Sequence, residues 1–128
     1  MTLPAAMTVL LIEDQKQSRE LVAYMLQSLG VGKVAQSPGG VDAIDQLRAA
    51  QQPFDVVLCD WMMPGVDGLG VLTELKKRWP ETPFLMMTSR ADQASVAEAI
   101  SAGVAGYLRK PFSMQDLQAR LMAYARKR

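Results

Sequence analysis

The sequence contains no histidine, and this absence excludes several kinds of site. The chain cannot form a Ser-His-Asp or Cys-His catalytic group, a histidine-ligated zinc site or a phosphohistidine of its own. The single cysteine, Cys59, excludes an internal disulfide framework and fits a reducing cytosol, so we expect a cytoplasmic protein. Because Cys59 lies inside an apolar run, we expect a buried and unreactive thiol.

The sequence also lacks an excess of charge and any long apolar run. The formal net charge is +1, so no overall field favours nucleic acid or an anionic membrane as a partner. No apolar stretch approaches the roughly 20 residues of a membrane helix. We therefore expect neither nucleic-acid binding nor membrane insertion. The 128 residues, of which 49% are hydrophobic and 21% charged, suit one globular domain.

Strand-like and helix-like segments alternate along the chain. Short apolar runs indicate strands at Val9–Ile12, Lys33–Gln36, Val56–Cys59, Phe84–Met87 and Gly106–Lys110. Between and after them, apolar residues at helical spacing indicate five helices, marked by Leu21, Val22, Met25, Leu26 and Leu29; Val41, Ile44 and Leu47; Leu69, Val71, Leu72 and Leu75; Val96, Ala97 and Ile100; and Leu117, Leu121 and Tyr124. Gly30 and Gly103 are expected helix ends, and Ser113 with Asp116 resembles a capping box.

Five such units with doubly buried strands predict an α/β fold, in which helices cover both faces of a parallel sheet. Ligands of these sheets bind outside the carboxyl ends of the strands. Polar residues stand at four of the predicted ends, namely Glu13 and Asp14, Asp60, Thr88 and Lys110. We expect them to converge on one edge of the sheet.

These residue types suit phosphoryl chemistry with a metal ion. Glu13, Asp14 and Asp60 would bring three carboxylates close together. Such carboxylates either raise the pKa of one of them or require a cation. A site made only of oxygen ligands suits Mg²⁺. Lys110 adds a positive charge and Thr88 a hydroxyl, both suited to a phosphoryl group. An aspartate can attack phosphorus to form an aspartyl phosphate, and Asp60, at the tip of the central strand, fits that role.

Four motifs, VLLIEDQ, VVLCDWMMPGVDG, MMTSR and GYLRKPF, occur in the order and spacing of a known family. The chain from about Thr8 to Ala125 resembles a receiver domain of two-component response regulators, of the CheY-like kind. Each motif alone is a weak signal, whereas the four together are specific. The resemblance implies a flavodoxin-like (βα)5 fold, doubly wound, with strand order 2-1-3-4-5.

The resemblance also implies a role for each site residue. A histidine kinase would transfer its phosphoryl group to Asp60, and Mg²⁺ would be held by Glu13, Asp14, Asp60 and the backbone carbonyl of Met62. The phosphoryl oxygens would contact Thr88 and Lys110. The Lys110–Pro111 peptide bond would be cis, and Thr88 with Tyr107 would form a switch.

Simpler interpretations exist for these residues taken one at a time. Glu13 and Asp14 could cap the first helix, Thr88 could be an ordinary β-branched strand residue, and Lys110 could be a solvated charge. The aromatic ring of Tyr107 is also common in strands.

Two positions depart from the pattern of chemotaxis regulators. Met62 and Arg90 lie two residues after Asp60 and Thr88, where those regulators often carry an amide and an acid. A thioether cannot orient water as an amide can, and Arg90 would cover the site. We therefore expect slow self-dephosphorylation, and a dedicated phosphatase that relies on those side chains is in doubt.

The main alternative of another class is an enzyme. Phosphatases of the haloacid dehalogenase type also use a strand-end aspartate with Mg²⁺, but they need a second aspartate where this chain has Met62. A nucleotide hydrolase would need a G-x-x-x-x-G-K-[ST] loop, which is absent. A flavin phosphate would be repelled by Glu13 and Asp14. A receiver that is never phosphorylated is a further alternative, disfavoured by the intact site. We expect no substrate turnover beyond the chain's own phosphorylation and dephosphorylation.

We expect a short N-terminal extension, residues 1–7, followed by a single receiver domain over residues 8–128. Since no DNA-binding or enzymatic module follows the last helix, the signal is expected to leave through another protein. That protein would bind the face formed by the fourth helix, fifth strand and fifth helix. Asp60-Trp61 resembles chemotaxis regulators that bind a flagellar motor switch, which favours a stand-alone regulator. A phosphorelay shuttle and a receiver fragment of a larger regulator are the alternatives.

Overall fold

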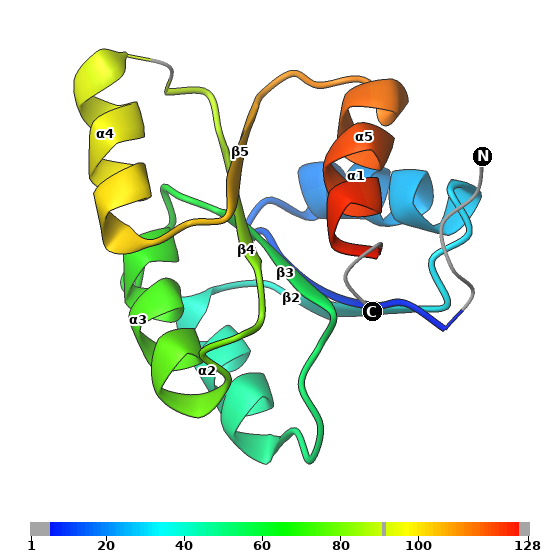
Figure 1. Ribbon diagram of the computed structural model, residues 1–128, viewed down its shortest axis with the longest axis horizontal. Helices are drawn as coiled ribbons and strands as arrows, with labels where there is room; N and C mark the ends of the chain where they lie inside the picture. Colours follow the sequence, from blue (N-terminus) through cyan, green and yellow to red (C-terminus); the bar gives the residue numbers. More distant parts are fainter. Residues whose placement is uncertain (1–5, 91, 126–128) are drawn as a thin grey trace.

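The computed structural model describes residues 6–90 and 92–125 and confirms the predicted α/β class (Figure 1). Strands and helices alternate in the order β1 (Thr8–Ile12), α1 (Lys16–Ser28), β2 (Lys33–Ser37), α2 (Gly40–Ala49), β3 (Val56–Asp60), α3 (Gly68–Arg78), β4 (Phe84–Thr88), α4 (Gln93–Ala102), β5 (Gly106–Arg109) and α5 (Met114–Ala125). Every predicted segment corresponds to one of these elements, with small shifts at the ends.

The strands form one parallel sheet in the order β2-β1-β3-β4-β5, which is the order that the resemblance implies. The register brings the carboxyl ends of the strands to one level, because Ile12 pairs with Cys59 and Thr88 pairs with Arg109. Asp60, the last residue of β3, pairs with Met87. Residues that follow these strand ends therefore meet at one edge of the sheet.

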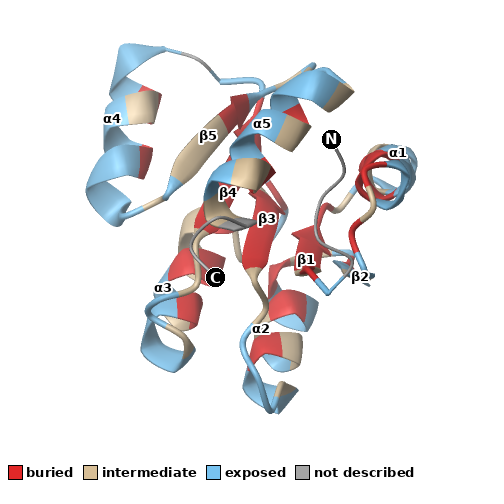
Figure 2. Cartoon of the chain, turned by 45° about the vertical axis from the view of Figure 1, so that its right-hand side comes forward, coloured by how far each residue is buried: buried red, intermediate tan, exposed pale blue. Residues whose placement is uncertain are grey.

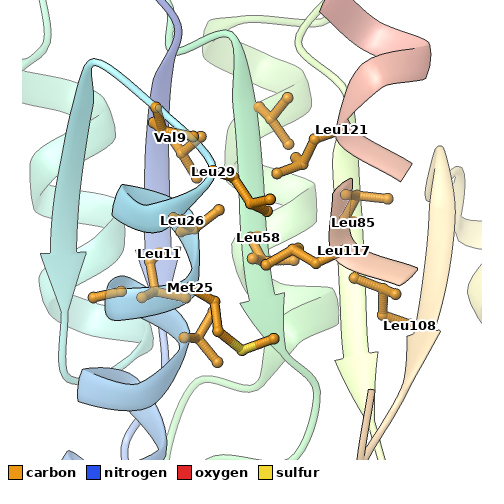
Figure 3. Close-up of a cluster of buried hydrophobic side chains, with 14 of the residues drawn as sticks. Val9, Leu11, Met25, Leu26, Leu29, Leu58, Leu85, Leu108, Leu117 and Leu121 are labelled. Carbon is orange, nitrogen blue, oxygen red and sulfur yellow. The ribbon is translucent and has the colours of Figure 1, made fainter. Parts of the chain in front are cut away.

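Both faces of the sheet are covered by helices, which explains why the inner strands β1, β3 and β4 are mainly apolar. The edge strand β2 contains polar and exposed residues. Val9 and Leu11 of β1 join a core cluster with α1 and α5 (Figure 3). Leu10 and Ile12 point to the other face, where they join a cluster with α2, α3 and α4. Each helix is buried along one side and exposed along the other (Figure 2). The alternation of side chains along each strand thus supplies two separate cores.

Turn and cap residues mark helix ends and a helix start where the sequence predicts them. Gly30 after α1 and Gly103 after α4 have positive φ values of 95° and 102°, which favour glycine. At the start of α5, Ser113 and Asp116 form the predicted capping box. The backbone N–H of each donates to the side chain of the other at 3.0 Å.

The predicted apolar faces are wrong at four helix positions. Leu21 on α1, Val41 on α2 and Ile100 on α4 are 60%, 64% and 63% exposed. Ala97 on α4 is exposed as well. On α4 the buried residues are Ser95 and Ala99 instead. The contact face of α4 is therefore formed by small side chains and not by the largest apolar residues.

The proposed N-terminal extension ends in a residue that belongs to the core. Met7 is buried, and its carbonyl accepts hydrogen bonds from the N–H groups of Gly32 and Lys33 at 3.0 and 3.1 Å. Residues 1–5 lie outside the described part of the chain, so the domain boundary stays a prediction. None of the described helices combines the length and apolar character needed to cross a membrane.

Candidate functional site

Three carboxylates gather at the carboxyl edge of the sheet, at the ends of two neighbouring strands. Glu13 and Asp14 directly follow β1, and Asp60 ends β3 beside it. One oxygen from each carboxylate lies within 4.8 Å of the other two. Oxygen atoms at this spacing can share one divalent cation.

Lys110, which follows β5, brings a positive charge into this group. Its Nζ lies 2.5 Å from Oε1 of Glu13 and 3.5 Å from Oδ1 of Asp60. The Lys110–Pro111 peptide bond is cis, the isomer that the resemblance implies. The structure therefore places Lys110 beside Asp60, as the sequence predicts, but its nearer partner is Glu13.

Glu13 is fully buried and its carboxylate is held from several sides. The hydroxyl of Ser18 donates to Oε1 at 2.8 Å, and the N–H of Gln15 donates to Oε2 at 3.3 Å. Burial would raise the pKa of Glu13, but the hydrogen bonds from Lys110 and Ser18 outweigh it and hold the pKa below its ordinary value. Glu13 is thus kept ionised.

Asp60 behaves in the opposite way. Burial raises the pKa of Asp60 from 3.8 to about 6; the charge of Lys110 opposes this rise and that of Glu13 adds to it. Burial also raises the pKa of Asp14, and a hydrogen bond with Glu13 contributes to the rise. Without a metal ion, the site therefore carries more negative charge than its surroundings stabilise, and a cation would relieve it.

The loop after β3 fixes the backbone of Asp60. Asp67 caps α3 by accepting a hydrogen bond from the N–H of Gly70 at 3.0 Å, and the N–H of Gly68 donates to the carbonyl of Trp61 at 2.8 Å. A Cβ atom on Gly68 would lie only 2.8 Å from the carbonyl oxygen of Asp60. Only glycine at position 68 lets the helix begin this close to the site.

Thr88 and Arg90 border the site at the carboxyl end of β4. Thr88 is buried, and its Oγ1 accepts a hydrogen bond from the N–H of Arg90 at 3.0 Å. The Arg90 side chain reaches back to the loop after β3, where its NH1 lies 3.6 Å from Sδ of Met62. Its guanidinium carbon also lies 5.4 Å from the centre of the Trp61 ring. Arg90 and Met62, which the sequence places at the site entrance, are therefore in contact.

Tyr107 on β5 completes a ring of contacts around the site. Its hydroxyl donates a hydrogen bond to the backbone carbonyl of Arg90. Its ring meets that of Trp61 edge to face, with the ring centres 6.5 Å apart. Trp61 therefore links Arg90 to Tyr107.

The sequence did not identify Ser18 or Trp61 as parts of the site. Ser18 lies in the first turn of α1, directly after the acid pair, and that position is the only sequence signal for its contact with Glu13. Trp61 follows Asp60, but nothing in the sequence indicates which way its ring points. Ser18 contacts Glu13 through a hydrogen bond, and Trp61 contacts Arg90 and Tyr107 through its ring.

The donor groups fit a magnesium ion. The ligands available are carboxylate oxygens, which Mg²⁺ prefers, and the described residues place no histidine or free thiolate among them. A groove of about 390 Å³ leads away from Lys110 along α1, lined mainly by apolar side chains such as Leu21, Met25 and Phe112. The site thus adjoins an accessible apolar surface.

Comparisons with known proteins agree with the resemblance seen in the sequence. The family model of the response regulator receiver domain matches residues 9–122. The chemotaxis protein CheY of Pseudomonas aeruginosa is 32% identical over 117 residues, which cover 90% of this chain and 93% of that protein. The chain is similar to these proteins over nearly its whole length.

Solved structures give the same result at the level of the fold. The chemotaxis protein CheY4 of Vibrio cholerae superposes with a TM-score of 0.84 at 27% identity, covering 93% of this chain and 98% of that one. The receiver domain of a sensor histidine kinase of Pseudomonas aeruginosa, which has a magnesium ion coordinated in its active-site cleft, has a TM-score of 0.84 at 28% identity. It covers 94% of this chain and 98% of its own.

Proposed function

Because the chain belongs to the response regulator receiver domain family, we propose that it accepts a phosphoryl group on Asp60 and thereby switches its binding to another protein. The phosphodonor would be the phosphohistidine of a histidine kinase. The observation that carries this proposal is the place of Asp60, at the end of a central strand with two acids on one side and Lys110 at 3.5 Å. The apolar groove beside Lys110 suits a protein as donor.

The transfer follows from the groups present. An oxygen of the Asp60 carboxylate attacks phosphorus, the phosphorus–nitrogen bond breaks, and the imidazole leaves with the bonding electrons. Lys110 and the hydroxyl of Thr88 would bind the phosphoryl oxygens and stabilise their charge. Hydrolysis of the acyl phosphate by water then returns Asp60 to a carboxylate and releases phosphate.

We propose Mg²⁺ as the metal ion of this site. Glu13, Asp14, Asp60 and the backbone carbonyl of Met62 would hold it, and the bound ion would supply positive charge to the carboxylates and the phosphoryl group. The surplus negative charge of the site supports this assignment. So does the magnesium ion in the similar receiver domain from Pseudomonas aeruginosa.

A stand-alone regulator of the chemotaxis type is the role that we favour. Its support is the similarity to a chemotaxis protein over 93% of that protein's length. The similar receiver domain of a sensor histidine kinase favours a second candidate, a phosphorelay shuttle or a receiver within a larger regulator. In each case we propose a cytoplasmic protein without separate substrate turnover.

The direct test is to incubate the protein with acetyl phosphate and Mg²⁺ and to measure its intact mass. We expect a gain of one phosphoryl group in the wild type and no gain in Asp60→Asn. The exposed Asp45→Asn on α2 is the matched control and should be labelled normally. A mass gain that persists in Asp60→Asn would overturn the assignment of the phosphoacceptor.

A further inference from the structure

We propose that Arg90 is a further phosphoryl-binding residue of this chain. Its guanidinium rests on Trp61 and Met62 while Asp60 is unmodified, and it moves onto the phosphoryl oxygens once Asp60 is phosphorylated. This inference rests on the proposed function and adds one residue to it. The sequence predicts only that Arg90 covers the site entrance, whereas this inference places its guanidinium on the phosphoryl oxygens.

The contacts of Arg90 in the structure are weak ones. A thioether sulfur is a poor hydrogen-bond acceptor, and the NH1 group of Arg90 lies 3.6 Å from Sδ of Met62. The guanidinium lies 5.4 Å above the Trp61 ring at an exposed position, where a cation–π interaction contributes little. The nearby acid Asp92 accepts hydrogen bonds from the backbone N–H and hydroxyl of Ser95. These bonds are the main cause that lowers the pKa of Asp92, and the charge of Arg90 contributes less. A stronger acceptor would therefore displace these contacts.

Arg90 stands where a phosphoryl group on Asp60 can be reached. Its backbone N–H is bonded to Thr88 at the end of β4, and β4 is the neighbour of β3. Its two side-chain partners, Trp61 and Met62, are the residues that directly follow Asp60. The side chain thus already spans from one strand end to the other, and a change of side-chain torsions is enough to redirect it.

Phosphorylation would supply the stronger acceptor. It adds nearly two negative charges and three acceptor oxygens to Asp60, and the structure places only Lys110 within ion-pair distance of that residue among the described side chains. The planar guanidinium matches phosphoryl oxygens with two parallel hydrogen bonds, which a thioether and an indole ring cannot offer. The exchange replaces two weak contacts with charge-assisted hydrogen bonds.

The first test measures the affinity of a phosphoryl mimic. Beryllium fluoride is titrated with Mg²⁺ against wild type, Arg90→Lys and Arg90→Gln, and bound ligand is followed by fluorine NMR. We expect about tenfold weaker binding in Arg90→Gln, since a hydrogen bond to a charged group is lost, and an intermediate value in Arg90→Lys. Arg78→Gln is the matched control, because Arg78 lies over Trp79 in a similar way but at the far end of α3.

The second test follows the proposed movement through Trp61. In a Trp79→Phe background, Trp61 is the only tryptophan, and loss of the cation above its ring alters its fluorescence. Beryllium fluoride should change this emission in Trp79→Phe and change it far less when Arg90→Gln is added. If Trp79→Phe fails to fold, the NMR affinities alone decide.

The outcomes separate this inference from the function on which it rests. Equal affinity in wild type and Arg90→Gln would overturn the role of Arg90 and leave the phosphoacceptor proposal intact. Absence of beryllium fluoride binding in the wild type would overturn both. A tenfold loss of beryllium fluoride affinity in Arg78→Gln as well would mean that the overall charge of the protein causes the effect. This outcome would also refute the inference.

Discussion

Among the single residues of the site, Asp60 has a carboxyl group whose pKa is well above its ordinary value. Its pKa is raised to about 6 by burial, whereas the pKa of its neighbour Glu13 is lowered by Lys110 and Ser18. A carboxyl group whose pKa is raised on folding stabilises the protein at pH values below its ordinary pKa of 3.8. That contribution is lost as the pH rises through 6. In the absence of metal, Asp60 therefore lowers stability at neutral pH.

Asp60→Asn should stabilise the metal-free protein at pH 7. One pKa unit corresponds to about 1.4 kcal/mol, so we expect a gain of about 1 to 3 kcal/mol at pH 7 that disappears towards pH 4. Urea unfolding in the presence of a chelator, repeated across this pH range, measures it. Asp45→Asn should show no such gain, and a pH-independent effect of Asp60→Asn would contradict the electrostatic explanation.

Asp14 should be needed for metal binding and, through it, for phosphorylation. Removing a ligand carboxylate in Asp14→Ala should weaken Mg²⁺ binding by at least about tenfold, since outer-shell changes alone have effects of this size. A Mg²⁺ titration followed by Trp61 fluorescence in the Trp79→Phe background measures the affinity. Glu20→Ala, on the exposed side of α1, is the control. Undiminished phosphorylation of Asp60 in excess chelator would contradict the proposed requirement for a metal ion.

The lifetime of the phosphorylated form should depend on Met62 and Arg90. In the structure these side chains contact each other at the site entrance. In the phosphorylated form, Arg90 on the phosphoryl oxygens would exclude the hydrolytic water, and the thioether of Met62 would fail to orient it. We expect slow self-dephosphorylation in the wild type and roughly tenfold faster decay in a Met62→Asn, Arg90→Glu double variant. Loss of the phosphoryl mass with time gives the rate. An unchanged rate would show that neither side chain controls access of water.

Single residues also show where the sequence stops being informative. The convergence of Glu13, Asp60 and Lys110 could be predicted, because parallel strands bring their ends to one edge whatever the side chains do. The partners within the site could not. Whether Lys110 lies closer to Glu13 or to Asp60 depends on side-chain torsions, and so does the contact between Ser18 and Glu13.

At the scale of elements, the start of α3 determines how precisely Asp60 is placed. Gly68→Ala would put a methyl group 2.8 Å from the carbonyl oxygen of Asp60, so the helix or the strand end must shift. We expect a loss of about 1 to 3 kcal/mol from overpacking, although alanine is the better helix former. Phosphorylation of Asp60 should also slow.

Gly39→Ala provides a matched control for this prediction. Gly39 precedes α2 in an extended conformation, and a Cβ atom there would have nothing within 4 Å. The free energy of unfolding, measured by urea denaturation, should change by less than about 1 kcal/mol. Equal losses in the two variants would mean that close approach to Asp60 is not the cause.

The elements themselves were predictable from periodicity, but the side of a helix that is buried was not always so. On α1, Val22, Met25 and Leu26 are buried as expected, because large apolar residues there recur every three to four positions. On α4 most residues are small, and the helix packs through Ser95 and Ala99 while Ile100 faces outward. A helix with weak amphipathicity takes its orientation from its neighbours rather than from its own sequence.

At the scale of the whole molecule, β5 lies between α4 and α5 and these elements form one face (Figure 1). Ile100 is exposed on α4, and a groove of about 660 Å³ between β5 and α5 is lined in part by Tyr107, Arg109 and Arg120. Apolar and cationic groups on one accessible face suit a protein partner with apolar and acidic side chains. We therefore keep this face as the proposed docking site of the downstream protein.

Phosphorylation has a short path to this face. Thr88 accepts a hydrogen bond from the N–H of Arg90, and the carbonyl of Arg90 accepts one from the hydroxyl of Tyr107. A phosphoryl group on Asp60 should draw the Thr88 hydroxyl towards itself, which changes the position of Arg90 and of the ring bonded to it. Two arrangements of Tyr107 that differ by a few kcal/mol would suffice for phosphate to choose between them.

Tyr107→Ala should therefore uncouple partner binding from phosphorylation while Asp60 still accepts the phosphoryl group. Titration of phosphorylated and free protein against the cognate partner should show about tenfold tighter binding of the phosphorylated wild type and little difference in the variant. Tyr107→Phe keeps the ring packed on Trp61 but removes the hydrogen bond to Arg90, so it separates packing from coupling. Tyr24→Ala removes an exposed tyrosine from α1 and should behave as the wild type. If Tyr107→Ala kept the full phosphate dependence, Tyr107 would be ordinary strand packing, and the signal would have to leave the site through Trp61 or the backbone of α4.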